Sequence, residues 1–307
     1  MTIFNTSISF AIDTVDLRMW VYDTSKPIRG VIVSTPCCCD PNCTQLDFYQ
    51  RTAWQTLAVA HDFAIVGTYY HSTYPTEDGA YQALIDGIKS LATISGHSEL
   101  SNAPMCLYGF SAGGMFSMYF AQYAPTRTIA FAHNKGRLTD ITFTGGALEV
   151  PGFISYGSLE SERISDNTNA FNRNRTNHAL LALVVDWNMP HDEPINSEPL
   201  ALFYFDQIIE CRLPTNYVPG NPYTLTTLAE NSGWLGNFST ATVYSHSTYP
   251  GNIYTASWLP NQFLANKWHN IVLQGGPGAG TFTNSIGKIC GSAPQQCNNP
   301  IIQFNLH

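Results

Sequence analysis

Short apolar runs alternate with amphipathic stretches along the first two thirds of the chain. The runs 30–35, 63–70 and 103–110 are short and mostly apolar, which predicts strands. Segments 45–60 and 77–94 carry apolar residues three and four positions apart, which predicts helices. The full pattern predicts strands over 8–12, 17–22, 30–35, 63–70, 103–110, 128–133, 150–157 and 179–187, and helices over 45–60, 77–94, 112–124, 166–178 and 198–212.

This alternation favours an α/β protein whose central sheet is mostly parallel and flanked by helices on both faces. The predicted strands are apolar throughout, as burial on both sides of a sheet requires. The pattern ends near Pro214, where Gly, Pro, Asn, Thr and aromatic residues take over, and only 259–272 still predicts a helix. We therefore expect one domain over 1–212 and an irregular C-terminal extension over 213–307 that packs on it.

The composition excludes two kinds of partner. Charged residues make up 12% of the chain, and 14 Lys+Arg stand against 22 Asp+Glu for a net charge of −8. A basic face that neutralises the phosphates of a nucleic acid is therefore not expected. No apolar run reaches the length of about 18 residues that a membrane-spanning helix needs.

The eight cysteines change the expected location of the protein. Four of them lie in 36–43, PCCCDPNC, while Cys290 and Cys297 bracket another short segment. An even number with close spacing favours disulfides and an oxidising compartment. With the low charge, this predicts a secreted or periplasmic protein, although no signal peptide opens the sequence. Buried reduced cysteines are the alternative. A zinc site is less favoured because its paired ligand spacing is missing.

One motif carries chemistry. Residues 109–114 read GFSAGG, a G-x-S-x-G pattern placed between a predicted strand and a predicted helix, which is the context that gives this motif meaning. A sharp turn there projects the Ser111 hydroxyl from the sheet edge, and small residues on both sides allow it. The N–H of Ala112, at the helix start, can stabilise negative charge on a substrate oxygen.

On its element order and its GFSAGG turn, segment 28–212 resembles the α/β-hydrolase family, in particular dienelactone-hydrolase-like proteins and compact esterases. The resemblance implies an α/β-hydrolase fold and the chain order nucleophile, acid, histidine. It also implies a second oxyanion donor in the loop after the third strand, here a backbone N–H of Cys37 or Cys38.

A serine nucleophile needs a histidine base and a carboxylate that orients the histidine. In the preferred arrangement, Glu160 follows the strand 150–157 and His191 follows the strand 179–187. Each gap leaves room for one strand–helix unit, and the count of elements closes at residue 212. Glu162 is the fallback acid. The use of Glu departs from the family's usual Asp.

A second arrangement stays open from the sequence alone. Asp192 would then be the acid after 179–187, and His246 would be the base after a strand at 241–245. It needs an unusually long, glycine-rich span before the last strand, and it turns 150–157 into an extra element.

The expected function is hydrolysis of carboxylic esters through an acyl-enzyme, with no metal or cofactor. The sequence does not choose among ester substrates. A small-molecule ester, a polyester, and a feruloyl or acetyl group on a polysaccharide all stay open. A serine peptidase of the same fold and a non-catalytic binding protein are the alternatives. Tyr70, His71 and Trp187 are candidate substrate contacts because they lie near the expected site loops, although a surface hydrogen bond is the simpler interpretation of His71.

Overall fold

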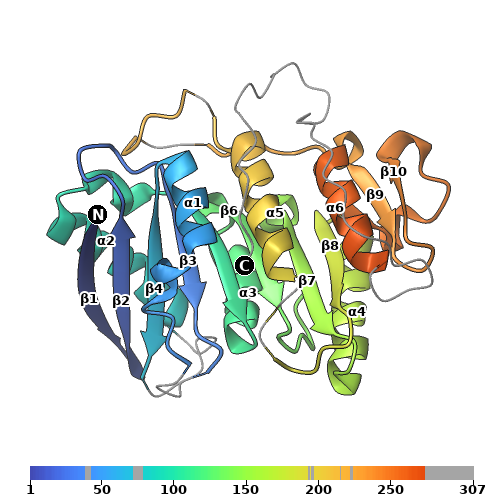
Figure 1. The fold of residues 1–307 in the computed structure, drawn as a ribbon, viewed down its shortest axis with the longest axis horizontal. Coiled ribbons are helices and arrows are strands. Elements are labelled where there is room, and N and C mark those ends of the chain that lie inside the picture. Colours follow the sequence, from blue (N-terminus) through green and yellow to red (C-terminus); the bar gives the residue numbers. More distant parts are fainter. Residues whose placement is uncertain are drawn as a thin grey trace.

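An eight-stranded sheet with the order β1-β2-β4-β3-β5-β6-β7-β8 forms the centre of the molecule (Figure 1). The computed structural model describes residues 1–38, 43–71, 79–192, 194, 197–214, 216–221 and 224–273. β2 runs antiparallel to both its neighbours, and all the other neighbouring pairs are parallel. The strands are β1 (Thr2–Phe10), β2 (Asp13–Val21), β3 (Gly30–Thr35), β4 (Phe63–Tyr70), β5 (Met105–Phe110), β6 (Thr128–Asn134), β7 (Gly152–Gly157) and β8 (Leu181–Asp186).

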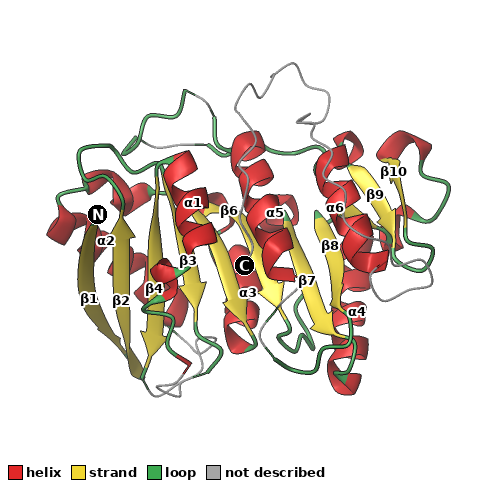
Figure 2. Ribbon diagram, in the orientation of Figure 1, coloured by secondary structure: helices red, strands yellow, loops and turns green. Residues whose placement is uncertain are grey.

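Helices cover both faces of this sheet (Figure 2). One face carries α2 (Ala80–Ser95), α3 (Ala112–Tyr123) and α4 (Ser161–Thr176), and the other carries α1 (Thr52–His61), α5 (Ser197–Arg212) and α6 (Gln262–Leu273). The expected fold class, a mostly parallel sheet between two helical layers, is confirmed.

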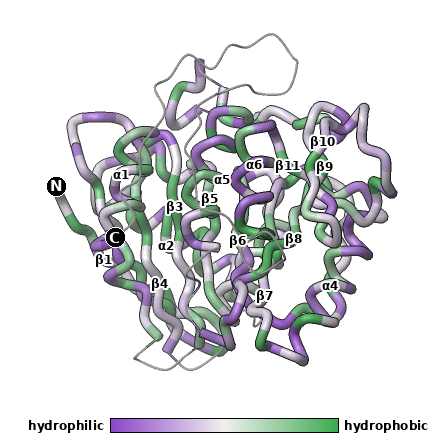
Figure 3. Tube along the Cα trace, turned by 45° about the vertical axis from the view of Figure 1, so that its right-hand side comes forward, coloured by the Kyte–Doolittle hydropathy of each residue, from purple (hydrophilic) through white to green (hydrophobic). Residues whose placement is uncertain are grey.

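Each central strand supplies side chains to two separate hydrophobic layers. In β3, Val31 and Val33 pack on the α2–α3 side, while Ile32 packs on the α1–α5 side. Successive side chains of a strand point to opposite faces, so a strand covered on both sides is apolar along most of its length. Apolar colour covers much of the central strands in Figure 3.

Several predicted boundaries were wrong, two of them for clear physical reasons. The strand expected over 17–22 is β2, Asp13–Val21, and the helix expected over 166–178 is α4, Ser161–Thr176. β1 spans Thr2–Phe10 rather than 8–12, because it is an edge strand whose exposed positions are mostly polar (Asn5, Ser7 and Ser9) and weaken the apolar signal. The predicted helix over 45–60 is divided into a 3-10 turn at Phe48–Gln50 and α1. Gln45 donates its N–H to the carbonyl of Thr68 in β4, which holds the segment before the turn in a non-helical conformation.

The C-terminal extension contains a small antiparallel sheet of order β10-β9-β11, which the sequence did not reveal as a unit. β9 (Trp234–Asn237), β10 (Thr242–Ser245) and β11 (Ser257–Leu259) have three or four residues each, too few for a clear period. The helix expected over 259–272 is found as α6, Gln262–Leu273. The division into 1–212 and 213–307 stays a prediction.

The extension covers the outer edge of the central sheet beside β8 (Figure 1). Leu183 of β8 donates its N–H to Ser257 Oγ at 2.9 Å, and its carbonyl accepts the Trp268 Nε1–H at 2.6 Å. Trp258 and Trp268 have no exposed surface. Side chains of the extension thus satisfy backbone groups that an edge strand would otherwise leave open. None of the described helices is long and apolar enough to cross a membrane.

Candidate active site

Ser111 occupies a strained turn between β5 and α3. Its φ of 55° and ψ of −119° lie outside the regions that non-glycine residues prefer. Its N–H donates to the carbonyl of Asn134 at 2.8 Å. A Cβ added to Gly109 would lie 2.2 Å from Gly113, and a Cβ added to Gly113 would lie 2.2 Å from the carbonyl oxygen of Thr35. The two motif glycines are therefore required by close backbone contacts.

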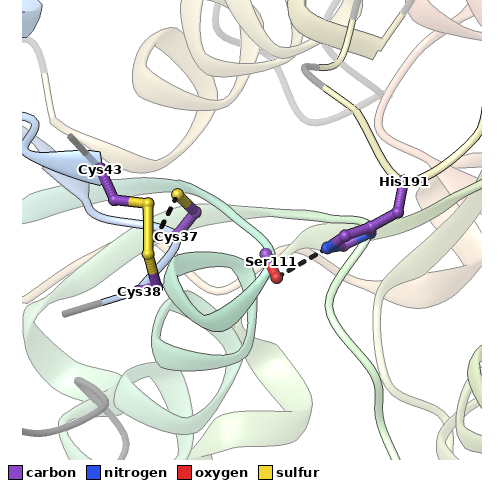
Figure 4. The surroundings of a disulfide bond; sticks show 5 residues. All are labelled: Cys37, Cys38, Cys43, Ser111 and His191. Atoms are coloured by element: carbon purple, nitrogen blue, oxygen red, sulfur yellow. Dashed lines mark hydrogen bonds between the residues drawn. A yellow bond between two sulfur atoms is a disulfide. The ribbon is translucent and has the colours of Figure 1, made fainter. Parts of the chain in front are cut away.

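His191 joins Ser111 to Glu160. Its Nε2 lies 2.9 Å from Ser111 Oγ (Figure 4), and its Nδ1 lies 2.5 Å from Glu160 Oε1. An ionised carboxylate only accepts hydrogen bonds, so Nδ1 carries the donated proton. Nε2 of the neutral ring is then the acceptor for the serine hydroxyl. The imidazole is 31% exposed, which leaves it accessible from solvent.

The Glu160 carboxylate is held in its charged form. Its side chain is 1% exposed, and its Oε2 accepts the N–H of Gly157 at 2.5 Å. Arg163 Nη1 lies 3.5 Å from Oε1. Burial alone would raise the pKa of Glu160, but the hydrogen bonds from His191 and Gly157, with the nearby positive charges, hold it below its usual value. The charge therefore persists at neutral pH.

Parallel strands explain how three residues so distant in sequence meet. Glu160 follows β7 and His191 follows β8, and the ends of these strands lie at the same edge of the sheet as the Ser111 turn after β5. The structure thus brings together the residues of the preferred arrangement. Leu159 donates its N–H to the carbonyl of Met189 at 3.0 Å, which joins the two loops directly.

The residues of the other arrangement lie elsewhere. His246 opens a 3-10 turn in the extension and donates its N–H to Gly233, and β10 before it pairs with β9 rather than with the central sheet. Asp192 is exposed and adjoins His191, and its carbonyl accepts a hydrogen bond from Lys135. The Glu162 side chain is 78% exposed and faces Arg137 at 3.7 Å.

The loop after β3 was expected to supply an N–H beside that of Ala112, but it places a carbonyl there. Ala112 donates its N–H to the carbonyl of Cys37 at 3.3 Å, so the loop after β3 presents an acceptor there. Cys38 and Cys43 form a disulfide, and the Cys37 thiol lies 3.9 Å from Cys38 Sγ (Figure 4). The Ala112 N–H therefore already has a backbone acceptor in this conformation.

The same cysteines form the one group of candidate metal ligands found among the described residues. The three sulfur atoms of Cys37, Cys38 and Cys43 lie within 4.8 Å of one another. Thiolates bind metals, and a disulfide sulfur is not a thiolate, so metal binding here would first require reduction. Cys39, Cys290 and Cys297 lie outside the described residues.

The three candidate substrate contacts, Tyr70, His71 and Trp187, all pack against or hydrogen-bond to other parts of the protein. Tyr70 has no exposed surface and packs against Phe10 and Phe116, so we do not retain it as a substrate contact. His71 Nε2 lies 2.8 Å from Asp16 Oδ2 on β2, in line with the simpler interpretation. Trp187 donates its Nε1–H to the carbonyl of Val272 and stacks on Phe238, so it links β8 to the extension.

Two neighbours of the site were missed in the sequence. Phe110, within the G-x-S-x-G motif, stacks on the His191 ring with centroids 4.9 Å apart. The motif allows any residue there, so it gave no signal. Arg163 stands three residues after Glu160 at the start of α4, a helical spacing that could have indicated the ion pair.

Comparison with known proteins finds likeness in structure only. No family model and no curated protein matches the sequence. An arylesterase is 9% identical, with 68% of this chain and 83% of that chain covered at a TM-score of 0.48. A dienelactone hydrolase from Anabaena variabilis is 15% identical (66% and 96% covered, TM-score 0.45), and a phospholipase/carboxylesterase from Dyadobacter fermentans is 14% identical (63% and 95%, TM-score 0.44).

Likenesses of this size concern the course of the backbone alone. The topology itself is decisive: the second strand is antiparallel, the strand order is β1-β2-β4-β3-β5-β6-β7-β8, and a serine turn joins the fifth strand to the next helix. This chain therefore has the α/β-hydrolase fold.

Proposed function

We propose that the protein is a serine hydrolase that cleaves carboxylic esters, with Ser111, His191 and Glu160 as its catalytic residues. The observation that carries the proposal is the position of the His191 ring, which reaches the serine hydroxyl with one nitrogen and a buried carboxylate with the other. This arrangement supplies the base that a serine hydroxyl lacks near neutral pH.

In the proposed reaction, Ser111 Oγ attacks the ester carbonyl while His191 Nε2 takes the hydroxyl proton. The Glu160 carboxylate stabilises the imidazolium that results. His191 then returns the proton to the departing alcohol, which leaves an acyl-serine. Water, deprotonated by the same nitrogen, attacks this acyl group and releases the acid and the free serine.

Oxyanion stabilisation requires a change at Cys37 in this scheme. The carbonyl of Cys37 and the N–H of Cys38 belong to one peptide group. Rotation of that group would withdraw the acceptor from Ala112 and turn the Cys38 N–H toward the site. Ala112 and Cys38 would then form the two-donor hole, which is worth about 10²–10³ in rate per donor in serine proteases.

The low charge of the chain fits a neutral substrate, and the Phe110 ring beside His191 offers an apolar contact. We retain small and polymeric esters as substrates, including polyesters and feruloyl or acetyl groups on polysaccharides. A serine peptidase would use the same residues. Rates on p-nitrophenyl acetate and on peptide p-nitroanilides separate the two, and we expect the ester to be strongly preferred.

A fluorophosphonate probe tests the proposal directly. We expect the probe to label the wild-type protein at Ser111 and to leave Ser111→Ala unlabelled. A wild-type protein that is folded but unlabelled, and inactive on p-nitrophenyl acetate, would instead favour a binding protein on a hydrolase scaffold.

Two histidine variants test the base. His191→Ala should lose nearly all ester hydrolysis, whereas His246→Ala is the matched control and should retain it. The reverse outcome would return the assignment to Asp192 and His246.

A further inference from the structure

Lys135 combines two unfavourable features at one position. It follows β6 directly and adopts a φ of 54°, a left-handed conformation that costs free energy in a residue with a Cβ. Its side chain has no exposed surface, and a buried ammonium is costly unless it is paired. Backbone strain and a buried charge at the same residue point to a functional reason for the ammonium group.

The contacts of the ammonium group indicate that task. Nζ lies 3.0 Å from Asp186 Oδ2, whose side chain is also fully buried, and donates to the carbonyl of Asp192 at 2.9 Å. Asp186 ends β8, and Asp192 directly follows His191. One cation therefore joins the beginning of the histidine loop to the residue after the histidine.

Asp186 extends this connection to the far end of the loop. Its Oδ1 accepts the N–H of Ser197 at 2.9 Å, and its Oδ2 lies 3.2 Å from Ser197 Oγ, where α5 begins. On the other side of His191, the carbonyl of Met189 accepts the N–H of Leu159. The histidine thus lies between an anchor at Met189 and an anchor at Asp192.

We propose that Lys135 is a positioning residue for His191, which it holds at the distance and angle that Ser111 requires through its hydrogen bond to the Asp192 carbonyl, while the Asp186 carboxylate balances the ammonium charge. The inference rests on the proposed function. Lys135 touches no reacting atom, so its loss should leave substrate binding unchanged and slow the chemical step.

The test removes the Asp192 contact without leaving a buried charge. Lys135→Met combined with Asp186→Asn is neutral, and the new asparagine can still accept the N–H of Ser197. We expect kcat for p-nitrophenyl acetate to fall by about tenfold to a hundredfold, the loss that a displacement near 1 Å produces, while KM changes less than about twofold. The rate of fluorophosphonate labelling should fall by the same factor as kcat.

Asp186→Asn alone separates the two contacts of Lys135. It keeps the donor to Asp192 but leaves the buried ammonium unpaired, so its melting temperature should fall more than that of the double variant while its kcat falls less. The matched control is neutral substitution of another buried pair, His61→Gln with Asp206→Asn, which replaces a His–carboxylate contact between α1 and α5 by an amide pair and should leave kcat unchanged.

A folded double variant that turns over like the wild type would overturn the inference. So would an equal loss of kcat in Asp186→Asn, because the ion pair alone would then be responsible. If Lys135→Met with Asp186→Asn does not fold, Lys135→Gln with Asp186→Asn replaces it. The amide pair keeps a hydrogen bond inside the protein, but the glutamine side chain is too short to reach Asp192. The same outcomes then decide. Absence of labelling in the wild type would contradict the proposed function itself, whereas normal labelling in both proteins contradicts only the role of Lys135.

Discussion

The Glu160 carboxylate sets which nitrogen of His191 carries the proton, and this gives a sharp test at a single residue. In Glu160→Gln the amide can donate to Nδ1, which favours the tautomer whose Nε2 already bears a proton and cannot accept one from Ser111. We expect kcat to fall by about 10⁴. Glu160→Asp, the control, keeps the charge on a shorter side chain and should lose less. Equal kcat in wild type and Glu160→Gln would contradict the proposed role.

His133 links stability to pH. It is fully buried at the end of β6, and burial lowers its pKa from 6.5 to about 3, opposed in part by the charge of Glu160. Between these two values the unfolded chain binds a proton that the folded protein excludes. Stability must therefore decrease as the pH falls from 6.5 toward 3, by about 1.4 kcal/mol for each unit of pKa difference.

The variant His133→Leu removes that term. We expect its free energy of unfolding, measured by urea denaturation, to depend less steeply on pH in this interval than that of the wild type. Parallel curves for the two proteins would show that His133 contributes nothing to the acid sensitivity.

Individual residues were predictable where a turn or a strand end defined them. Ser111, Glu160 and His191 each follow a strong strand signal, so the sequence placed them among its candidates, although the arrangement with Asp192 and His246 stayed open. Lys135 and Phe110 gave no such signal because their importance arises from contacts with loops distant in sequence. The orientation of the Cys37 peptide was equally inaccessible, since no residue pattern encodes it.

At the scale of elements, the extension acts as a cover for the edge strand β8. Trp268→Phe keeps most of the apolar volume but leaves the buried Leu183 carbonyl without its donor at 2.6 Å. We expect a loss of about 1–3 kcal/mol in the free energy of unfolding, measured in urea. Trp20→Phe is the matched control, because the buried Trp20 Nε1 has no hydrogen-bond partner within the described chain. Equal losses would mean that packing, not the hydrogen bond, is responsible.

Elements buried on two sides were predicted most closely. β3 and β4 agree with the sequence at both ends because their apolar runs are uninterrupted. The short strands β9 and β11 were not expected, because they gain their stability from β8 and α6 rather than from local preference.

At the scale of the whole molecule, the two parts of the chain share one hydrophobic layer. Leu235, Trp258, Leu264 and Trp268 pack in the same cluster as α5. A chain cut after Arg212 would expose that surface, so we expect it to be insoluble or to bind the dye ANS strongly. A chain ending at residue 273 keeps every described contact and should remain soluble. A monomeric, cooperative 1–212 fragment would contradict this prediction.

The contact between the Ala112 N–H and the Cys37 carbonyl has a consequence for the time course of inhibition. A boronic acid or a trifluoromethyl ketone must first displace this carbonyl before its own oxygen can take the place. Binding would then have two steps, and the observed association rate, followed by stopped-flow, should level off with increasing inhibitor concentration. An association rate that rises linearly throughout would mean that the peptide already rotates freely in the unliganded protein.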